Sequence, residues 1–277
     1  MTPKPPVAVL DLFPDERRHL LALLSGLTPD QWDAPTVCPG WSVKDIAGHL
    51  LGDDLQRLSG GRDGYRSGAS AGPRAWNDLV AFLNRRNQEW VAAHRRLSPR
   101  VLVELLGWSG ERVLEHFLTL DLAEPGRPVD WAGPEPAPRW LDVAREYTER
   151  WVHQEQIRDA VGVGGLRERR LFHPVLDVLV HALPHTYRDV RGPEGTHVRL
   201  VVTGEAGGGW SLVRQENRWA LFVGVEAAPA SVVTLDQDTA WRLFTKGAAA
   251  AAARCRATIE GDQHLGAVAL GAVAIIA

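Results

Sequence analysis

The sequence predicts an α+β protein, in which a helical bundle precedes a smaller domain that contains a sheet. Up to about residue 165, apolar residues recur at the spacing of amphipathic helices. Beyond that point, short runs rich in β-branched residues alternate with glycine-rich or polar turns. The composition, with 45% hydrophobic and 23% charged residues, is that of an ordinary folded protein. We therefore expect two domains, at 1–165 and 166–277.

Helix starts in the first part are marked by capping residues. Thr28 precedes Pro29 and has Gln31 three positions later, which is typical of a capping box. Ser42 is expected to cap another helix, with Asp45 three positions on. Substantial helices joined by long connections are typical of a four-helix bundle. The expected helices span about 12–24, 42–59, 74–97, 98–122 and 139–161.

The remaining segments complete this outline. The glycine-rich stretch 60–73 is expected to be a mobile loop and the proline-rich stretch 123–138 a stiff connection. In the second domain, a helix over 172–187 is expected to be interrupted by Pro184. The expected strands lie at 197–203, 210–214, 219–223, 231–235 and 257–260, and the remaining helices at about 236–245, 247–256 and 263–275.

Charge and composition exclude several classes of partner. Lys and Arg total 31 against 34 Asp and Glu, a net charge of −3, so the basic footprint of a nucleic-acid-binding protein is absent. No apolar run reaches the ~20 residues of a membrane span, and residues 1–6 do not lead into a signal peptide. Two cysteines do not make a disulfide framework. A cytoplasmic protein that acts on a small molecule is the expectation.

One set of residues has the pattern of a metal site. Glu149 and His153 are four positions apart on a predicted helix, so both side chains project from the same face. His49 lies mid-helix on the apolar face of another helix and could complete a His/Glu/His set. Three such ligands with an open fourth position are typical of catalytic zinc, although iron, nickel or manganese would suit them. Asp53, one turn after His49, is a candidate to orient its ring.

Spacing alone favours ordinary alternatives, namely a helix-surface ion pair and a hydrogen-bonded core histidine. Other pairs at the same spacing are expected to be structural, because neither recruits a third ligand; they are His181 with His185 and Glu111 with Glu115. Cys38 is a poor candidate for a nucleophile, since no histidine is placed beside it by spacing. Cys255, in an alanine-rich helix, is expected to be a packed small hydrophobe. Trp41 and Trp151 are more typical of core than of a pocket wall.

Two segments resemble a known family. The stretch 35–50 reads PTVCPGWSVKDIAGHL, and 147–160 reads YTERWVHQEQIRDA within the broader matching stretch 140–162. Both are similar to the mycothiol-dependent maleylpyruvate isomerase family, within the DinB-like bundle superfamily. The C-terminal part, ending in 260–262, resembles the family's sterol-carrier-like domain. The resemblance implies that the metal ligands are His49, Glu149 and His153.

The same resemblance implies an activity. A divalent metal, with zinc expected, would bind a low-molecular-weight thiol such as mycothiol for isomerisation or S-transfer on a small molecule. Many relatives carry Asp where this chain has Gln156, so a contact behind the metal ligands is expected to differ. The family also uses an arginine of the second domain. The candidates for that arginine are Arg199, Arg214, Arg242 and Arg256. The alternatives are a metal-binding protein with hydrolytic or no thiol chemistry, and a carrier of an apolar ligand through the second domain.

Overall fold

The computed structural model describes residues 1–66, 76–247 and 250–274. They form two compact units, neither continuous in sequence. The helical unit comprises Val9–Asp121 and Glu149–Gly165; the sheet unit comprises Met1–Ala8, Leu122–Thr148 and Leu166–Ile276. Residues 1–8 and 122–148 cluster with the sheet, and the chain also changes unit between 165 and 166. The domain bounds expected from the sequence, 1–165 and 166–277, stay a prediction.

The helical unit follows the expected helices closely. Where the sequence predicts a loop from residue 60, α3 instead runs on through a π-helical turn to Arg62. Residues 67–73 of that loop, and 74–75 of the next expected helix, lie outside the described residues. The elements are η1 (Leu10–Leu12), α1 (Phe13–Ser25), α2 (Pro29–Trp32), α3 (Val43–Gln56), η2 (Arg57–Arg62), α4 (Trp76–His94), α5 (Pro99–Leu118) and α6 (Arg139–Val161), whose C-terminal part belongs to this unit.

Side-chain caps explain where three of these helices begin. The Thr28 hydroxyl accepts a hydrogen bond from the Gln31 amide, and Ser42 accepts one from the Asp45 amide. Both caps are full capping boxes, because the Gln31 and Asp45 side chains accept in return from the cap amides. The sequence predicts the box at Thr28 and the cap at Ser42. Ser98 caps α5 by accepting from the Val101 amide. These caps set the start of α3 and hence the position of His49 along it.

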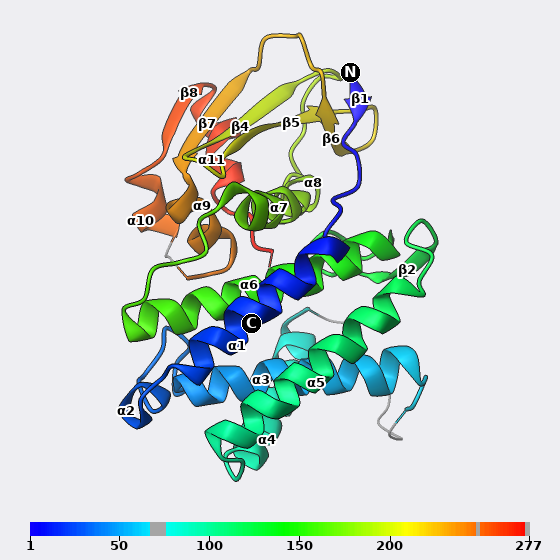
Figure 1. Cartoon of the computed structure of the whole chain (residues 1–277). Coiled ribbons are helices and arrows are strands. Elements are labelled where there is room, and N and C mark those ends of the chain that lie inside the picture. Colours follow the sequence, from blue (N-terminus) through cyan, green and yellow to red (C-terminus); the bar gives the residue numbers. More distant parts are fainter. Residues whose placement is uncertain (67–75, 248–249, 275–277) are drawn as a thin grey trace. The chain divides into compact units, whose positions relative to one another are not determined.

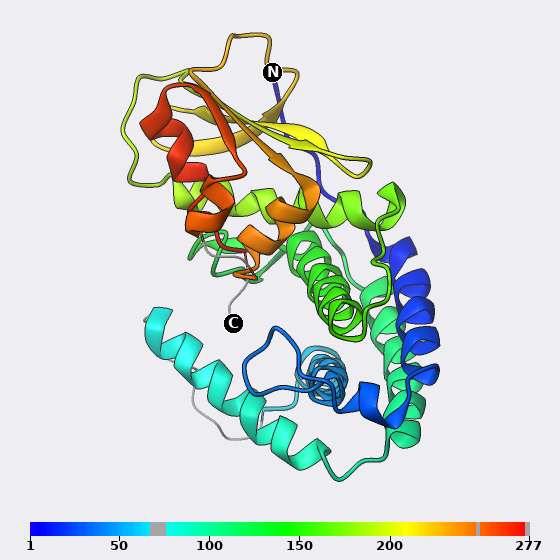
Figure 2. The same cartoon turned by 90° about the vertical axis from the view of Figure 1, so that its left-hand side faces the viewer.

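In the helical unit, α3 packs against both α4 and α5, and α5 packs against α1 (Figures 1 and 2). Two glycines of α3 allow α4 to approach closely. A Cβ on Gly48 would lie 2.0 Å from the His94 ring, and one on Gly52 would lie 2.5 Å from the Trp90 indole. Around this contact, a buried apolar core includes Leu20, Leu24, Val43, Ile46, Leu50, Leu102, Leu106 and Ile157.

The sheet unit is built on a mixed sheet, which in the described residues has the strand order β1-β6-β5-β4-β7-β8. Neighbouring strands are antiparallel except β4 and β7, which run parallel. The strands are β1 (Thr2–Pro3), β4 (His197–Thr203), β5 (Gly208–Arg214), β6 (Trp219–Val223), β7 (Ser231–Asp236) and β8 (Thr258–Gly261). A separate antiparallel pair is formed by β2 (Pro125–Pro128) and β3 (Pro136–Pro138), inside the stretch expected to be a stiff connection.

Helices cover this sheet. Contacts join α8 to β6, α9 to β4 and β7, and α11 to β4, β7 and β8 (Figure 1). The helices of the unit are α7 (Arg169–Leu179), η3 (Val180–Ala182), α8 (Leu183–Thr186), α9 (Gln237–Phe244), α10 (Ala250–Arg254) and α11 (Gln263–Ala269). Residues 248–249 and 275 of two expected helices lie outside the described residues. Among the helices described in either unit, none has the length and hydropathy required to cross a membrane.

Candidate functional site

Two helices of the helical unit bring the predicted histidines together. His49 on α3 and His153 on α6 lie with their ring centroids 4.8 Å apart and their planes at 81°. Both residues are buried, with exposed fractions of 7% and 4%. The neighbours of His49 on α3, Ile46 and Leu50, point into the apolar core, so the helix register carries the imidazole inward. Two histidines that are 104 positions apart in the sequence thus share one buried site.

Each histidine has a carboxylate one turn away on its own helix. His153 Nε2 lies 3.6 Å from Glu149 Oε2, and His49 Nε2 lies 3.3 Å from Asp53 Oδ2. The helical spacing expected for Glu149 and His153 is therefore observed as a contact. Asp53 contacts the His49 ring. The sequence had suggested Asp53 as a residue that could orient this ring. The two helices thus contribute matching pairs of imidazole and carboxylate.

A glutamine determines how His153 carries its proton. The Nδ1 atom lies 2.8 Å from Gln156 Oε1, an oxygen that can only accept, so Nδ1 is the protonated nitrogen. Burial, followed by the charge on His49, lowers the pKa of His153 to about 4, while Glu149 opposes the shift. The ring is therefore neutral at pH 7, and its Nε2 lone pair is directed toward Glu149. Sequence reasoning noted Gln156 as a departure from relatives with Asp at this position, and expected a contact behind the metal ligands to differ there.

Cys38 also reaches this glutamine. Its Sγ donates to the same Gln156 Oε1 over 3.3 Å, a contact between residues far apart in sequence that spacing could not indicate. Burial raises the pKa of the Cys38 thiol, so the sulfur remains protonated at neutral pH. This agrees with the expectation that Cys38 is a poor nucleophile. Its role in the structure is to hydrogen-bond the loop before α3 to α6.

The donor types suit a divalent metal ion. An unprotonated imidazole nitrogen and a carboxylate oxygen that face each other at 3.6 Å repel electrostatically, and a cation between them would reverse that repulsion. Two imidazoles and one carboxylate form the donor set of many catalytic zinc sites. Across the described ranges, however, no group of three or more His, Cys, Asp and Glu side chains is arranged so that it could hold a metal ion. The ligand set His49, Glu149 and His153 therefore stays a prediction.

The loop before α3 places an aromatic side chain, Trp41, beside His49. The Trp41 ring lies 5.1 Å from the His49 ring, centroid to centroid. Trp41 is thus next to the site, whereas Trp151 is fully buried in the core, the role that sequence reasoning favoured for both. The Trp41 carbonyl accepts hydrogen bonds from the Thr36 hydroxyl and the Thr36 amide, which closes the loop on itself.

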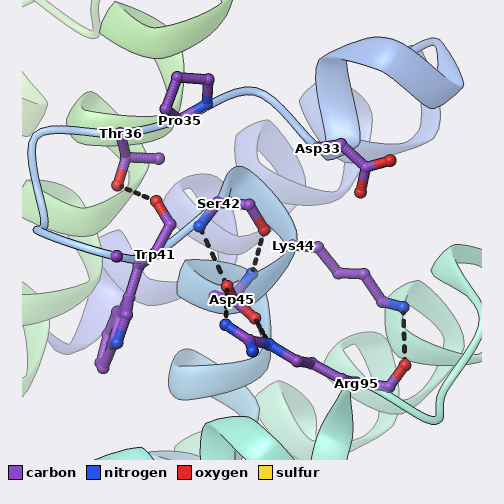
Figure 3. A pocket seen from close by; sticks show the side chains of 9 residues that line it. Asp33, Pro35, Thr36, Trp41, Ser42, Lys44, Asp45 and Arg95 are labelled. Atoms are coloured by element: carbon purple, nitrogen blue, oxygen red, sulfur yellow. Dashed lines mark hydrogen bonds and ion pairs between the residues drawn. The ribbon is translucent and has the colours of Figure 1, made fainter.

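A surface hollow of about 520 Å³ opens beside the same loop (Figure 3). Arg95 donates twice to Asp45 along one side of it, and Lys44 donates to the Arg95 carbonyl. Figure 3 shows the Trp41 indole pointing away from Asp33 and Lys44. These bonds join the start of α3 to the end of α4, and so they stabilise the loop that carries Trp41.

Next to the site in the sequence, a buried cluster of polar and charged side chains joins four helices, α1, α3, α5 and α6. Asp54 accepts from Arg17 at 2.9 Å, from Arg150 at 2.7 Å and from the Ser109 hydroxyl at 2.7 Å. Burial by itself would raise the pKa of Asp54, but the two guanidinium groups outweigh it and lower the pKa below its usual value. Asp54 follows Asp53 and Arg150 follows Glu149 in the sequence, so this cluster holds α3 and α6 at the turn where the site lies.

The competing pairs have structural surroundings. His181 packs edge-on against Trp140 at 5.2 Å in the sheet unit. On α5, Arg112 lies 3.6 Å from Glu111 and 2.9 Å from Glu115, so these carboxylates form a surface ion-pair group. Cys255 is exposed. Of the candidate arginines, Arg242 lies over the Trp241 ring at 4.4 Å and near Asp238.

The family model of the mycothiol maleylpyruvate isomerase N-terminal domain matches residues 13–158. This is more than half of the chain of 277 residues. The chain belongs to this family. The segment matched to the mycothiol maleylpyruvate isomerase N-terminal domain contains both histidines of the site as well as Glu149, Asp53 and Gln156.

Similar proteins and structures agree with the family. Proteins described as uncharacterized, from two strains of Mycobacterium tuberculosis, are 32% identical to the chain over 153 residues, which cover 53% of this chain and 54% of each relative. The match thus spans about half the length of these relatives. The solved mycothiol-dependent maleylpyruvate isomerase and a mutant of it match with a TM-score of 0.51 and 14% identity, over 84% of this chain and 86% of theirs. At that identity the match shows a shared fold.

Proposed function

We propose that this protein is a metal-dependent enzyme that uses a low-molecular-weight thiol for isomerisation or S-transfer on a small molecule. His49, Glu149 and His153 would hold the divalent metal, with zinc expected. The observation that carries the proposal is the buried contact between the two histidine rings, 4.8 Å apart, with Glu149 3.6 Å from His153. Membership in the mycothiol maleylpyruvate isomerase N-terminal domain family supports mycothiol or a related thiol as cosubstrate.

The side chains of the site prepare it for this role. His153 is neutral at pH 7 because burial lowers its pKa to about 4, so no proton needs to leave Nε2 before a metal is bound. A bound divalent metal would lower the pKa of a coordinated thiol and so supply a thiolate at neutral pH. The burial of both histidines and the Trp41 ring limit water at this position. Cys38, held as a thiol, leaves the nucleophilic role to the cosubstrate.

The setting of the activity is also part of the proposal. The composition and charge of the chain suit a cytoplasmic protein, the compartment in which low-molecular-weight thiols stay reduced. We propose a small-molecule substrate with an activated double bond for isomerisation, or with a leaving group for S-transfer.

Elemental analysis of the purified protein tests the metal site. Wild type incubated with zinc and then desalted should retain about one equivalent, because two imidazoles and a carboxylate with an open position are a complete catalytic set. His49→Ala, Glu149→Ala and His153→Ala should each lower the retained zinc, whereas His264→Ala, at an exposed histidine, should not. Wild type that is folded and retains no zinc, iron, nickel or manganese would overturn the proposal.

A thiol-dependence assay tests the chemistry. Candidate substrates are screened with the zinc-loaded protein, with and without mycothiol or a related thiol. Turnover that requires the thiol and is lost in His153→Ala supports the proposal. Turnover that proceeds equally well without thiol would replace it with a hydrolytic function, in which the same open position activates water.

A further inference from the structure

We infer that Gln156 is the positioning residue of this site: through His153 it selects which ring nitrogen faces the metal position, and through Cys38 it binds the loop before α3. The inference rests on the proposed function for the identity of the metal position. Gln156 is not one of the proposed metal ligands, and it acts through the two hydrogen bonds that its amide oxygen accepts.

That oxygen has two donors from different parts of the chain. His153 Nδ1 lies 2.8 Å from Gln156 Oε1, and Cys38 Sγ lies 3.3 Å from it. Gln156 is 7% exposed, so water competes little for these contacts. A buried amide oxygen with two protein donors is fully satisfied, and its orientation is therefore well defined.

The orientation of the amide has one consequence for the imidazole. Because Oε1 cannot donate, the neutral ring must carry its proton on Nδ1 and keep its lone pair on Nε2. If the amide were turned over, its NH2 group would face Cys38 Sγ, which is only a weak acceptor. The thiol thus favours the orientation in which Nε2, 3.6 Å from Glu149, is the nitrogen available to a metal ion.

Because the Gln156 amide at Nδ1 is uncharged, it also limits the basicity of His153 Nε2, the nitrogen proposed to bind the metal. Partners that accept from the distal nitrogen of a metal-binding histidine raise its basicity, a carboxylate more than an amide, and their loss typically costs about 10–100-fold in metal affinity. We therefore expect Gln156→Met, which keeps the volume and removes the acceptor, to weaken zinc binding by about 10–100-fold. Gln156→Glu keeps an acceptor and should bind zinc at least as tightly as wild type.

Two readouts on the same set of variants test the inference. Nitrogen-15 NMR of the zinc-free protein should show His153 as the Nδ1–H tautomer in wild type and Gln156→Glu, and as a mixture of tautomers in Gln156→Met. Competition with a zinc chelator should give the affinities stated above. Cys38→Ala removes only the thiol donor, so it should keep the Nδ1–H tautomer predominant and lower the affinity less than Gln156→Met does.

The outcomes separate this inference from the proposed function. An unchanged tautomer and an unchanged zinc affinity in Gln156→Met would overturn the role of Gln156, as would a larger effect of Cys38→Ala than of Gln156→Met. If wild type binds no zinc, the proposed function fails, and the tautomer comparison in the zinc-free protein still decides whether Gln156 orients His153. If Gln156→Met does not fold, Gln156→Asn, which draws the acceptor back by one methylene, gives the same comparison.

Discussion

Arg150 donates to Asp54 over 2.7 Å in the interior of the helical unit, where the two residues are 2% and 0% exposed. The pair joins α6 to α3 beside the two residues, Glu149 and Asp53, that contact the site histidines. Arg17, from α1, donates to the same carboxylate. One buried anion therefore sets the register of three helices around the candidate site.

Removal of that anion should be strongly destabilising. Asp54→Ala leaves two buried guanidinium groups without their partner, so we expect a loss of about 3–5 kcal/mol in the free energy of unfolding. Urea denaturation followed by circular dichroism measures this loss. Glu104→Ala breaks the exposed pair with Arg100 on α5 and should cost less than about 1 kcal/mol. Equal costs for the two variants would contradict the role of Asp54.

The close approach of α4 to α3 gives a second prediction. Gly48→Ala places a methyl group 2.0 Å from the His94 ring, so the ring or the helix must shift. We expect a loss of about 1–3 kcal/mol, measured by thermal or urea unfolding, as for other overpacked interiors. Gly164→Ala meets no atom within 4 Å and serves as the control, with stability unchanged or slightly raised. A Gly48→Ala variant as stable as wild type would show that the helices separate at no cost.

The Ser42 cap at the start of α3 gives a third prediction. Ser42→Ala removes the acceptor for the Asp45 amide, and we expect a loss of about 1 kcal/mol. Ser42→Gly should cost only a few tenths of that, because glycine is itself favourable at the cap. Because glycine removes more side-chain volume than alanine, a smaller cost for glycine would show that the loss in Ser42→Ala comes from the cap position and not from lost volume. A glycine variant less stable than the alanine variant would point to a different role for Ser42.

The sheet unit should lose stability in acid through His181. Burial, followed by the charge on Lys4, lowers the pKa of His181 from its usual 6.5 to about 4, against the opposing effect of Asp177. Between pH 6.5 and 4 the unfolded chain therefore binds more protons at this residue than the folded chain. The free energy of unfolding should fall as the pH falls through this window, by roughly 3 kcal/mol for this residue when the full shift is expressed.

A variant isolates that contribution. His181→Phe keeps a ring against Trp140 and cannot take up a proton, so its unfolding free energy should depend less steeply on pH between 6.5 and 4. His264→Gln, at an exposed position of α11, should keep the slope of wild type. If the His181→Phe and wild-type curves are parallel, the histidine is protonated in the folded state at the same pH as in the unfolded chain.

The regular parts of the fold were predictable from local pattern. The bounds expected for 139–161, 197–203 and 219–223 are those of α6, β4 and β6. The strands β2 and β3 begin and end with prolines, which remove ladder donors and argue against a strand in a sequence. The two residues of β1 carry no periodic signal at all; they become a strand only because the edge of β6 accepts them.

The site was predictable in part. Helical periodicity places His49 and the pair Glu149 and His153 on single faces, but it does not say that those faces meet; the resemblance to a family suggested that. The contact of Cys38 with Gln156 depends on where a loop lies, which no spacing rule encodes. Glu16 and Arg17 are buried although their sequence pattern is that of a solvated first turn, because their partners Gln154 and Asp54 come from other helices.

The edge position of β1 has a consequence for synthesis on the ribosome. Thr2 and Pro3 are made about 220 residues before their partners, Val223 and Phe222. Until those partners are made, β1 has no place in the sheet, and its pairing is among the most non-local contacts of the protein. The pairing of β1 with β6 should therefore complete late in maturation, after the helices encoded between the two strands have formed.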